Sequence, residues 1–168
     1  MTEDTTPSAI RIVTVSLRDP RDSSPDDTGS ALQDEFAQAG FQIMRHRVLR
    51  QDTTFIREFV QEVANQNEGD VVVINGGTGI GRSDRTAEAL AAIYDQPIDG
   101  FAEAFRRLYY EVIGPKAMFS RVSAGVFNEC LIYALPADKT GTLVGARKLI
   151  IPTLRDAIKL ASGELRGG

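Results

Sequence analysis

Short, β-branched apolar runs alternate along this chain with longer segments whose apolar residues recur at helical spacing. The short runs predict strands at 10–16, 41–49, 71–75 and 130–135. The longer segments predict helices at about 30–39, 55–63, 86–94, 101–111 and 143–161, the last one broken near Pro152. Residues 17–28 are charged and rich in Pro, Asp and Ser, which indicates a loop. The alternation predicts a three-layer α/β/α sandwich with a mostly parallel central sheet.

The stretch 71–84 is the centre of this pattern. Its strand ends at Asn75 and passes directly into a loop with glycines at 76, 77, 79 and 81. Ligands of open α/β sheets bind at the carboxyl ends of the strands, so we expect this loop to share one crevice with the strand ends at Ser16 and Leu135. Glycine lacks a Cβ, so the loop can present N–H groups to phosphate oxygens, and the following helix adds its dipole. We interpret the loop as an anion site, although a tight strand-to-helix turn would also use glycine.

The length of 168 residues suits one domain, which we predict over 10–168, behind a flexible tail at 1–9. The net charge of −4 gives no indication of a basic face, although it is compatible with local basic patches, so nucleic-acid binding is disfavoured. The first residues have no apolar signal core, and no run reaches about 18 apolar residues. We therefore expect a cytoplasmic protein with no membrane partner.

Cysteine and histidine are scarce. One cysteine, Cys130, lies in an apolar run and is predicted to be buried, which excludes a disulfide scaffold. One histidine, His46, is expected to have a structural role. Soft transition-metal sites therefore lack ligands, and any metal should be a hard ion such as Mg²⁺ bound by oxygen. The composition does not identify its ligands.

Two aspartates lie near the starts of predicted helices. Asp52 precedes one helix, and Asp84 lies between the glycine loop and the next, so both can cap a helix or add a favourable charge to its first turn. Both also lie at the ligand edge of the sheet.

Two common nucleotide motifs fit the loop poorly. Gly76 to Ser83 has the Walker A frame, but Arg82 stands where lysine should reach the phosphates, and the loop follows the third strand rather than the first. The glycine pattern is also similar to that of short-chain dehydrogenases, which need a Tyr-x-x-x-Lys pair. Ile113 and Gly114 stand at the lysine position after Tyr109 and Tyr110, so we discard that interpretation.

A third pattern covers most of the chain. The order of motifs from Ile10 to about Ser162 resembles the MoaB/MogA family of molybdenum-cofactor biosynthesis proteins, in its stand-alone MoaB-like form. The matching segments are Thr14-Val-Ser16, Gly76-Gly-Thr-Gly79, Asp84, Thr86-Ala-Glu-Ala89, Gly100-Phe101, Ser120-Arg-Val-Ser-Ala-Gly-Val126 and Leu135-Pro136-Ala137. Each is weak alone, and together, in order, they are specific.

This resemblance implies that the domain binds molybdopterin and that active members transfer AMP from Mg-ATP to its terminal phosphate, releasing pyrophosphate. It implies catalytic roles for Asp52 and Asp84 and a homo-oligomer, either a trimer or a hexamer. Apolar residues such as Phe101, Phe105 and Tyr109, if not fully buried, would support the oligomer. The residues implied to bind molybdopterin or ATP are Ser16, Gly76, Gly77, Thr78, Gly79, Ser120, Arg121 and Pro136.

The chain departs from the family pattern at several positions. Ala137 replaces the glycine of Leu-Pro-Gly, Ala87 replaces a helix-opening proline, Leu17 replaces a polar residue, and the loop around 27–30 is one residue short. A non-catalytic molybdopterin-binding protein and a structural oligomer of the same fold therefore remain alternatives. A P-loop-like NTPase is a less favoured one.

Overall fold

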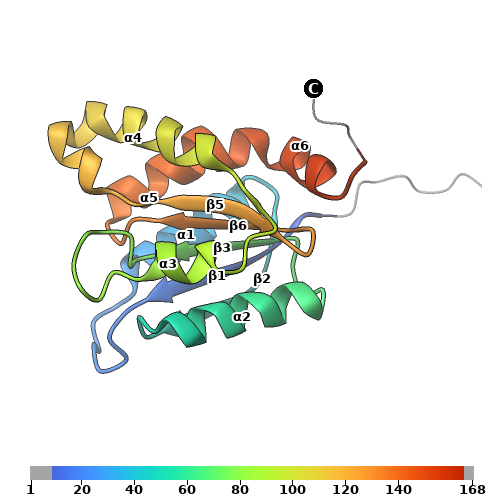
Figure 1. Cartoon of the computed structure of the whole chain (residues 1–168), viewed down its shortest axis with the longest axis horizontal. Coiled ribbons are helices and arrows are strands. Elements are labelled where there is room, and N and C mark those ends of the chain that lie inside the picture. Colours follow the sequence, from blue (N-terminus) through green and yellow to red (C-terminus); the bar gives the residue numbers. More distant parts are fainter. Residues whose placement is uncertain (1–8, 165–168) are drawn as a thin grey trace, which may run out of the picture.

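A computed structural model describes residues 9–164 and confirms the α/β prediction, with one six-stranded sheet lying between two layers of helices (Figure 1). In spatial order the strands are β2 (Gln42–Leu49), β1 (Arg11–Leu17), β3 (Val71–Asn75), β6 (Cys130–Leu135), β5 (Ser123–Phe127) and β4 (Gln96–Pro97). The helices are α1 (Asp27–Gln38), α2 (Thr53–Asn65), α3 (Thr86–Ala91), α4 (Asp99–Ile113), a 3₁₀ turn η1 (Gly114–Phe119), α5 (Lys139–Gly145), a π-helical segment η2 (Ala146–Ile150) and α6 (Ile151–Ala161). The predicted tail lies, except for its last residue, outside the described residues.

The sheet is mostly parallel, as predicted. Strands β2, β1, β3 and β6 run parallel, and β5 is antiparallel to both β4 and β6. The reversal occurs at Asn128 and Glu129, whose φ angles of 46° and 64° suit a two-residue hairpin turn. Strands β4 and β5 were not predicted. Their Pro, Ser, Ala and Gly content carries little strand propensity, and pairing with β6 decides their conformation.

Two cores cover the two faces of the sheet. Alternate strand residues such as Ile12, Val73 and Tyr133 pack with α1, α4 and α6 on one face. Their neighbours, such as Val13, Val72 and Ile132, pack under α2 and α3 on the other. Strand β3 is buried along its whole length, which explains why its sequence is a continuous apolar run rather than an alternating one.

Three helix boundaries differ from the prediction. Helix α5 begins at Lys139 rather than at 143, because Asp138 caps it by accepting from Gly141 N at 2.7 Å. Helix α1 begins at Asp27 rather than near Ser30, because the side chain of Asp26 caps it by accepting from the N–H of Gly29 at 3.0 Å. Gly29 suggested a loop in the sequence, but the helix needs glycine there, since a Cβ would lie 2.6 Å from Ser16 Oγ. Helix α3 ends at Ala91, short of the predicted 94, so its dipole is small.

The predicted break near Pro152 takes the form of a wider helical turn. Proline has no N–H for the bond to the preceding turn, and the π-helical segment Ala146–Ile150 comes just before it. The chain thus stays helical from α5 through α6.

Three aromatic residues named as support for an oligomer are in the core. Phe101 and Tyr109 are 7% exposed and Phe105 is fully buried, so these three residues do not support an oligomer. Helix α4 places them on its sheet-facing side. Within residues 9–164, none of the helices combines the length and apolarity needed to cross a bilayer.

Candidate ligand site at the carboxyl edge of the sheet

Three strand ends meet at one edge, as predicted. Ser16 pairs with Asn75, and Asn75 pairs with Leu135, so the ends of β1, β3 and β6 are adjacent. The glycine loop leaves the sheet at this edge. Its first residue, Gly76, is pinned by donating to Leu135 O at 2.9 Å, and a Cβ on Gly76 would lie 2.9 Å from Leu17 O.

The glycine loop presents a row of N–H groups. Gly76 and Gly77 have φ angles of 107° and 67°, conformations that favour glycine. The N–H groups of Gly77, Thr78 and Gly79 have no acceptor among residues 9–164. Successive free N–H groups in such a turn form a concave anion site. The arrangement therefore supports the anion-site interpretation without help from the short helix α3.

Arg121 holds this loop from behind. Its Nε donates to Gly79 O at 2.7 Å, and its Nη2 donates to Asp84 O at 2.7 Å. Its backbone N–H donates to Thr78 O at 2.6 Å, and its Nη1 pairs with Glu88 Oε1 at 2.5 Å. Much of the donor capacity of the guanidinium is thus committed to the protein. The geometry makes Arg121 a support of the loop rather than a free ligand group.

A cavity of about 390 Å³ opens beside the loop, and we call it the glycine-loop cavity. It brings together six of the residues predicted to act on ligands: Gly77, Thr78, Gly79, Asp84, Ser120 and Pro136. The Ser120 hydroxyl is buried without a hydrogen-bond partner among the described residues, so it is available to a ligand. The remaining lining residues are Tyr109, Ile113, Lys116, Phe119, Ala137 and Asp138.

The two predicted catalytic aspartates occupy different places. Asp84 lines the glycine-loop cavity and accepts from Gly81 N at 2.9 Å, while Arg85, not Asp84, stands at the N-cap of α3. A Cβ on Gly79 would lie 2.7 Å from the Asp84 carboxylate, so the glycine makes room for this acid. Asp52 does cap α2, with Oδ1 accepting from Thr54 N at 2.9 Å, and it does not line this cavity.

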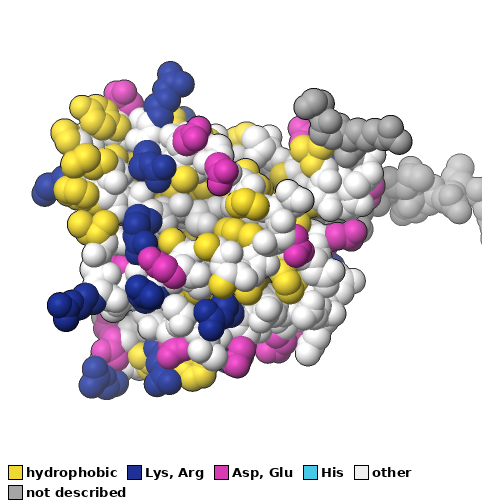
Figure 2. Space-filling model, in the orientation of Figure 1, with side chains coloured by type: hydrophobic (Ala, Val, Ile, Leu, Met, Phe, Trp, Pro, Cys, Tyr) yellow, Lys and Arg dark blue, Asp and Glu magenta, His cyan; other side chains and the backbone are white. Residues whose placement is uncertain are grey.

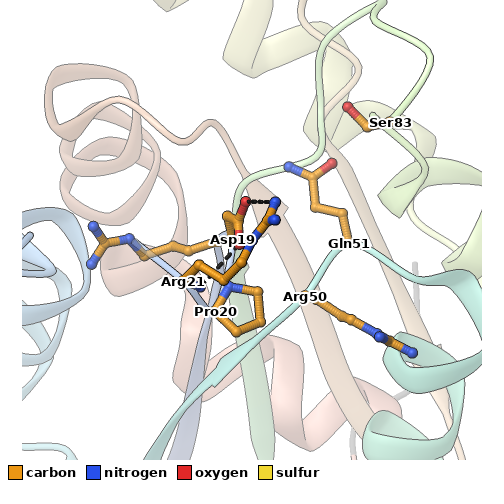
Figure 3. A pocket seen from close by; sticks show the side chains of 7 residues that line it. Asp19, Pro20, Arg21, Arg50, Gln51 and Ser83 are labelled. Atoms are coloured by element: carbon orange, nitrogen blue, oxygen red, sulfur yellow. Dashed lines mark hydrogen bonds and ion pairs between the residues drawn. The ribbon is translucent and has the colours of Figure 1, made fainter. Parts of the chain in front are cut away.

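A second cavity, of about 530 Å³, lies at the same edge and is rich in arginine; we call it the arginine cavity (Figure 3). Its lining residues are Arg18, Asp19, Pro20, Arg21, Arg50, Gln51 and Ser83. Gln51 directly precedes Asp52, and Ser83 directly precedes Asp84, so each predicted catalytic residue follows a lining residue of this cavity. Figure 3 shows Asp19 bonded to Arg21, whereas Arg50 extends toward α2, where its guanidinium stacks 4.4 Å from the Phe55 ring.

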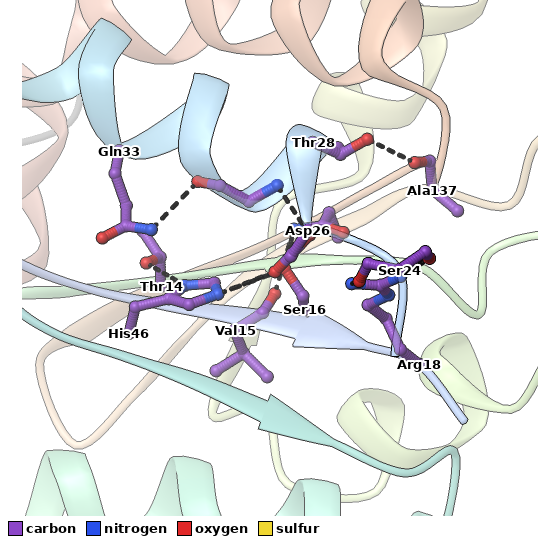
Figure 4. A network of polar contacts seen from close by, with 12 residues as sticks. Thr14, Val15, Ser16, Arg18, Ser24, Asp26, Thr28, Gln33, His46 and Ala137 are labelled. Carbon is purple, nitrogen blue, oxygen red and sulfur yellow. Dashed lines mark hydrogen bonds and ion pairs between the residues drawn. The ribbon is translucent and has the colours of Figure 1, made fainter. Parts of the chain in front are cut away.

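Ser16 lies inside a buried polar network rather than at an open surface (Figure 4). Its hydroxyl accepts from Asn75 Nδ2 at 2.9 Å and lies 3.4 Å from His46 Nε2. His46 also contacts Asp26 Oδ2 at 2.9 Å and Thr14 Oγ1 at 2.7 Å, in line with its expected structural role. Burial raises the pKa of Asp26, but hydrogen bonds from Ser16, Gly29 and His46 outweigh it, so the pKa lies below its usual value. The network fixes the start of α1 against the sheet.

Three polar residues of the glycine-loop cavity were not predicted. Lys116 comes from the 3₁₀ turn after α4, Tyr109 from α4 itself, and Asp138 from the loop between β6 and α5. The Tyr109 hydroxyl donates to Asp138 Oδ1 at 2.8 Å. Burial and the neighbouring Asp138 carboxylate raise the pKa of Tyr109, so it stays a phenol. Of these three residues, only Asp138 could have been found from the sequence, because it directly follows the Leu-Pro-Ala motif.

Magnesium suits the carboxylates at this edge. Mg²⁺ is commonly held by one or two carboxylates together with substrate phosphates, rather than by a complete protein cage. Asp84 and Asp52 each leave carboxylate oxygen capacity unused. Within the described range of residues, no cluster of three or more His, Cys, Asp or Glu side chains forms a metal cage. The residues therefore fit a metal that arrives with a phosphate ligand.

Comparisons with known proteins agree with this architecture. The sequence model described as "Probable molybdopterin binding domain" matches residues 11–156. A Bacillus cereus protein named "Molybdenum cofactor biosynthesis protein B" is 33% identical over 149 residues, which cover 88% of each chain. A crystal structure of a protein of the same name superposes with a TM-score of 0.88 and 31% identity, covering 94% of this chain and 98% of the other. A Methanocaldococcus jannaschii protein named "Probable molybdopterin adenylyltransferase" is 32% identical over 123 residues, 73% of this chain and 72% of its own.

The fold and the glycine loop therefore define a molybdopterin-binding-domain protein. More narrowly, the chain belongs to the MoaB/MogA family of molybdenum-cofactor biosynthesis proteins, as its motifs predicted.

Proposed function

We propose that this protein binds molybdopterin and adenylylates it with Mg-ATP. The observation that carries the proposal is the glycine-loop cavity, which joins the free N–H groups of residues 77–79 to the carboxylate of Asp84 and the unpartnered hydroxyl of Ser120. The name of the M. jannaschii relative supports the same activity. The volume of about 390 Å³ is in the range of small-molecule sites.

The two cavities suit the two substrates. The glycine-loop amides would hold the terminal phosphate of molybdopterin, while the arginine cavity would take the phosphates of ATP. In the transfer, a phosphate oxygen of molybdopterin forms a bond to the α-phosphorus of ATP. The bond from that phosphorus to the bridging oxygen breaks, and pyrophosphate leaves with the electron pair. The protein supplies positions and charge rather than a covalent nucleophile.

The carboxylates complete the proposed site. Asp84, with Asp52 from the α2 cap, would hold Mg²⁺, which neutralises phosphate charge when bound. Arg121 keeps the loop carbonyls in place, so the N–H groups stay directed at the ligand. The hydrogen bond from Asn75 Nδ2 to Ser16 Oγ holds the ends of β3 and β1 together.

One observation favours a non-catalytic molybdopterin-binding protein instead. One carboxylate oxygen of Asp52 accepts two hydrogen bonds at the start of α2, and Asp52 does not line the glycine-loop cavity. Asp52 can therefore take part in catalysis only if bound substrates extend across both cavities. Transfer of AMP separates the two possibilities.

The test uses Asp52→Asn and Asp84→Asn, because asparagine keeps cap hydrogen bonding but carries no charge. We expect nearly unchanged melting temperatures and a loss of AMP transfer from Mg-ATP to molybdopterin on the order of 100-fold or more. Asp156→Asn, at an exposed position of α6, is the matched control and should transfer normally. Full transfer in both site variants would remove these residues from the mechanism. Molybdopterin binding without transfer in the unmodified protein would establish the non-catalytic function.

We also propose a trimer or a hexamer. Large apolar side chains gather at the end of α4 and on η1, including Tyr110 (53% exposed), Val112 (51%) and Met118 (68%), as Figure 2 shows near the end of α4. Exposed apolar clusters of this kind favour association. Sedimentation at micromolar concentration tests the proposal, and a monomer would contradict it.

A further inference from the structure

The glycine-loop cavity has two chemically different ends. The glycine loop offers N–H donors, whereas the loop between β6 and α5 offers a carboxylate, Asp138. The charged lining side chains are Asp84, Lys116 and Asp138, so acids outnumber bases in this cavity. A ligand that carries anionic groups must therefore turn a hydrogen-bond donor, not a phosphate, toward Asp138.

The Asp138 carboxylate is held in one orientation. Its Oδ1 accepts from the Tyr109 hydroxyl at 2.8 Å, and its Oδ2 accepts from Gly141 N at 2.7 Å. An ionised carboxylate has about four acceptor positions, so both oxygens keep capacity for a ligand. Tyr109 stays a phenol beside this charge and continues to donate.

The loop that carries Asp138 is also fixed. Thr142 Oγ1 donates to Pro136 O at 3.0 Å, and Thr28 Oγ1 donates to Ala137 O at 3.0 Å. Two consecutive carbonyls are thus tied to α5 and to the start of α1, and Figure 4 shows the second bond. A carboxylate on such a loop is pre-organised, which lowers the entropy cost of ligand binding.

We propose that Asp138, oriented by Tyr109, is the specificity-determining residue that recognises a 2-amino-4-oxopyrimidine edge. This edge has a ring N–H beside an exocyclic amino group, two parallel donors that match the two oxygens of one carboxylate. The inference rests on the proposed function, because a pterin ring carries this edge. It assigns the ring to the β6–α5 loop and the phosphate to the glycine loop. Guanine carries the same edge, so both ring systems must be tested.

The experiment measures binding of phosphate-free rings. The probes are 6-hydroxymethylpterin and 6-hydroxymethyllumazine, which has an oxo group in place of the 2-amino group, titrated by fluorescence. The nucleosides guanosine and inosine form the second pair, since inosine also lacks the amino group. We expect the unmodified protein to prefer the aminated pterin by about 10-fold or more, the loss expected for one charge-assisted hydrogen bond.

Asp138→Asn keeps the size and the helix cap but turns an amide against the donor edge. It should lose about 10-fold or more in pterin affinity and abolish the preference over lumazine. Asp138→Ser, which also caps, should behave alike, and Tyr109→Phe should show a smaller loss of the same preference. Asp156→Asn on α6 is the matched control and should bind as the unmodified protein.

Unchanged pterin affinity in Asp138→Asn, equal binding of pterin and lumazine by the unmodified protein, or no binding of any probe would each overturn the inference. Discrimination in the guanine pair alone would support edge recognition by Asp138 and assign guanine, not pterin, as its source. A protein that shows the pterin preference but no AMP transfer would support Asp138 while refuting adenylylation.

Discussion

Replacing Arg121 by glutamine tests whether this residue supports the glycine loop or contacts the ligand. The substitution removes the donors to Gly79 O and Asp84 O, each at 2.7 Å, and the ion pair with Glu88. A hydrogen bond from a charged donor contributes about 1.5–3 kcal/mol, and an exposed ion pair about 0–1 kcal/mol. The side chain is 34% exposed, which favours the lower part of that range. We expect the free energy of unfolding to fall by about 2–4 kcal/mol.

Urea denaturation followed by circular dichroism measures this loss. Glu88→Gln is the control, because it removes only the partly exposed pair and should cost no more than about 1 kcal/mol. Ligand binding by Arg121→Gln should weaken together with stability, since the loop amides lose their support. Unchanged stability combined with lost molybdopterin binding would refute this reasoning and make Arg121 a direct ligand residue.

The same pair predicts a dependence on pH. The hydrogen bond from Arg121 lowers the pKa of Glu88. A carboxylate whose pKa is depressed by folding stabilises the protein above the usual glutamate range, and this contribution is lost as the pH falls through the folded pKa. The stability difference between the unmodified protein and Glu88→Gln should therefore be full near neutral pH and shrink in acid. A difference that grows in acid would contradict the ion pair.

Three further outcomes are expected. Gly77→Ala should lower the free energy of unfolding by about 2 kcal/mol or more, because its φ is 67° and a Cβ would collide with Thr86 Oγ1. The control Gly40→Ala, at φ 89° with no atoms near the new Cβ, should lower it by only about 1–2 kcal/mol, as measured by urea denaturation. Asp26→Asn should reduce the free energy of unfolding at pH values above the usual aspartate pKa, because the pKa of Asp26 is lowered in the folded protein. The variant should also lose less stability than the unmodified protein as the pH falls. A pH profile of stability that is unaltered from about pH 3 to pH 7 would refute this. Cys130 should resist alkylation until the protein unfolds, because burial raises its pKa to about 12, and rapid labelling of the native protein would contradict the burial.

The sequence alone determined the fold class and the place of the candidate site. Strand β3 is recognisable because a strand buried on both faces needs a continuous apolar run, and the glycines after it are recognisable because close backbone turns need residues without a Cβ. Motif order along the chain then sufficed to indicate the family. The meeting of three strand ends at one edge followed from the parallel arrangement, since the carboxyl ends of parallel strands lie at the same edge of a sheet.

Tertiary structure decided which side chains line the candidate site and which are committed to contacts within the protein. The side chains of Arg121 and Ser16 could bind an anion or a pterin. In the fold, however, Arg121 donates to carbonyls of the glycine loop, and Ser16 is buried and accepts from Asn75, because both side chains point into the protein. Tyr109 and Asp138 lie 29 residues apart, so no local pattern could predict their contact. Hydrophobic periodicity reports which face of an element is buried, but the meeting of polar groups from α4 and the β6–α5 loop depends on how the helices pack across the sheet.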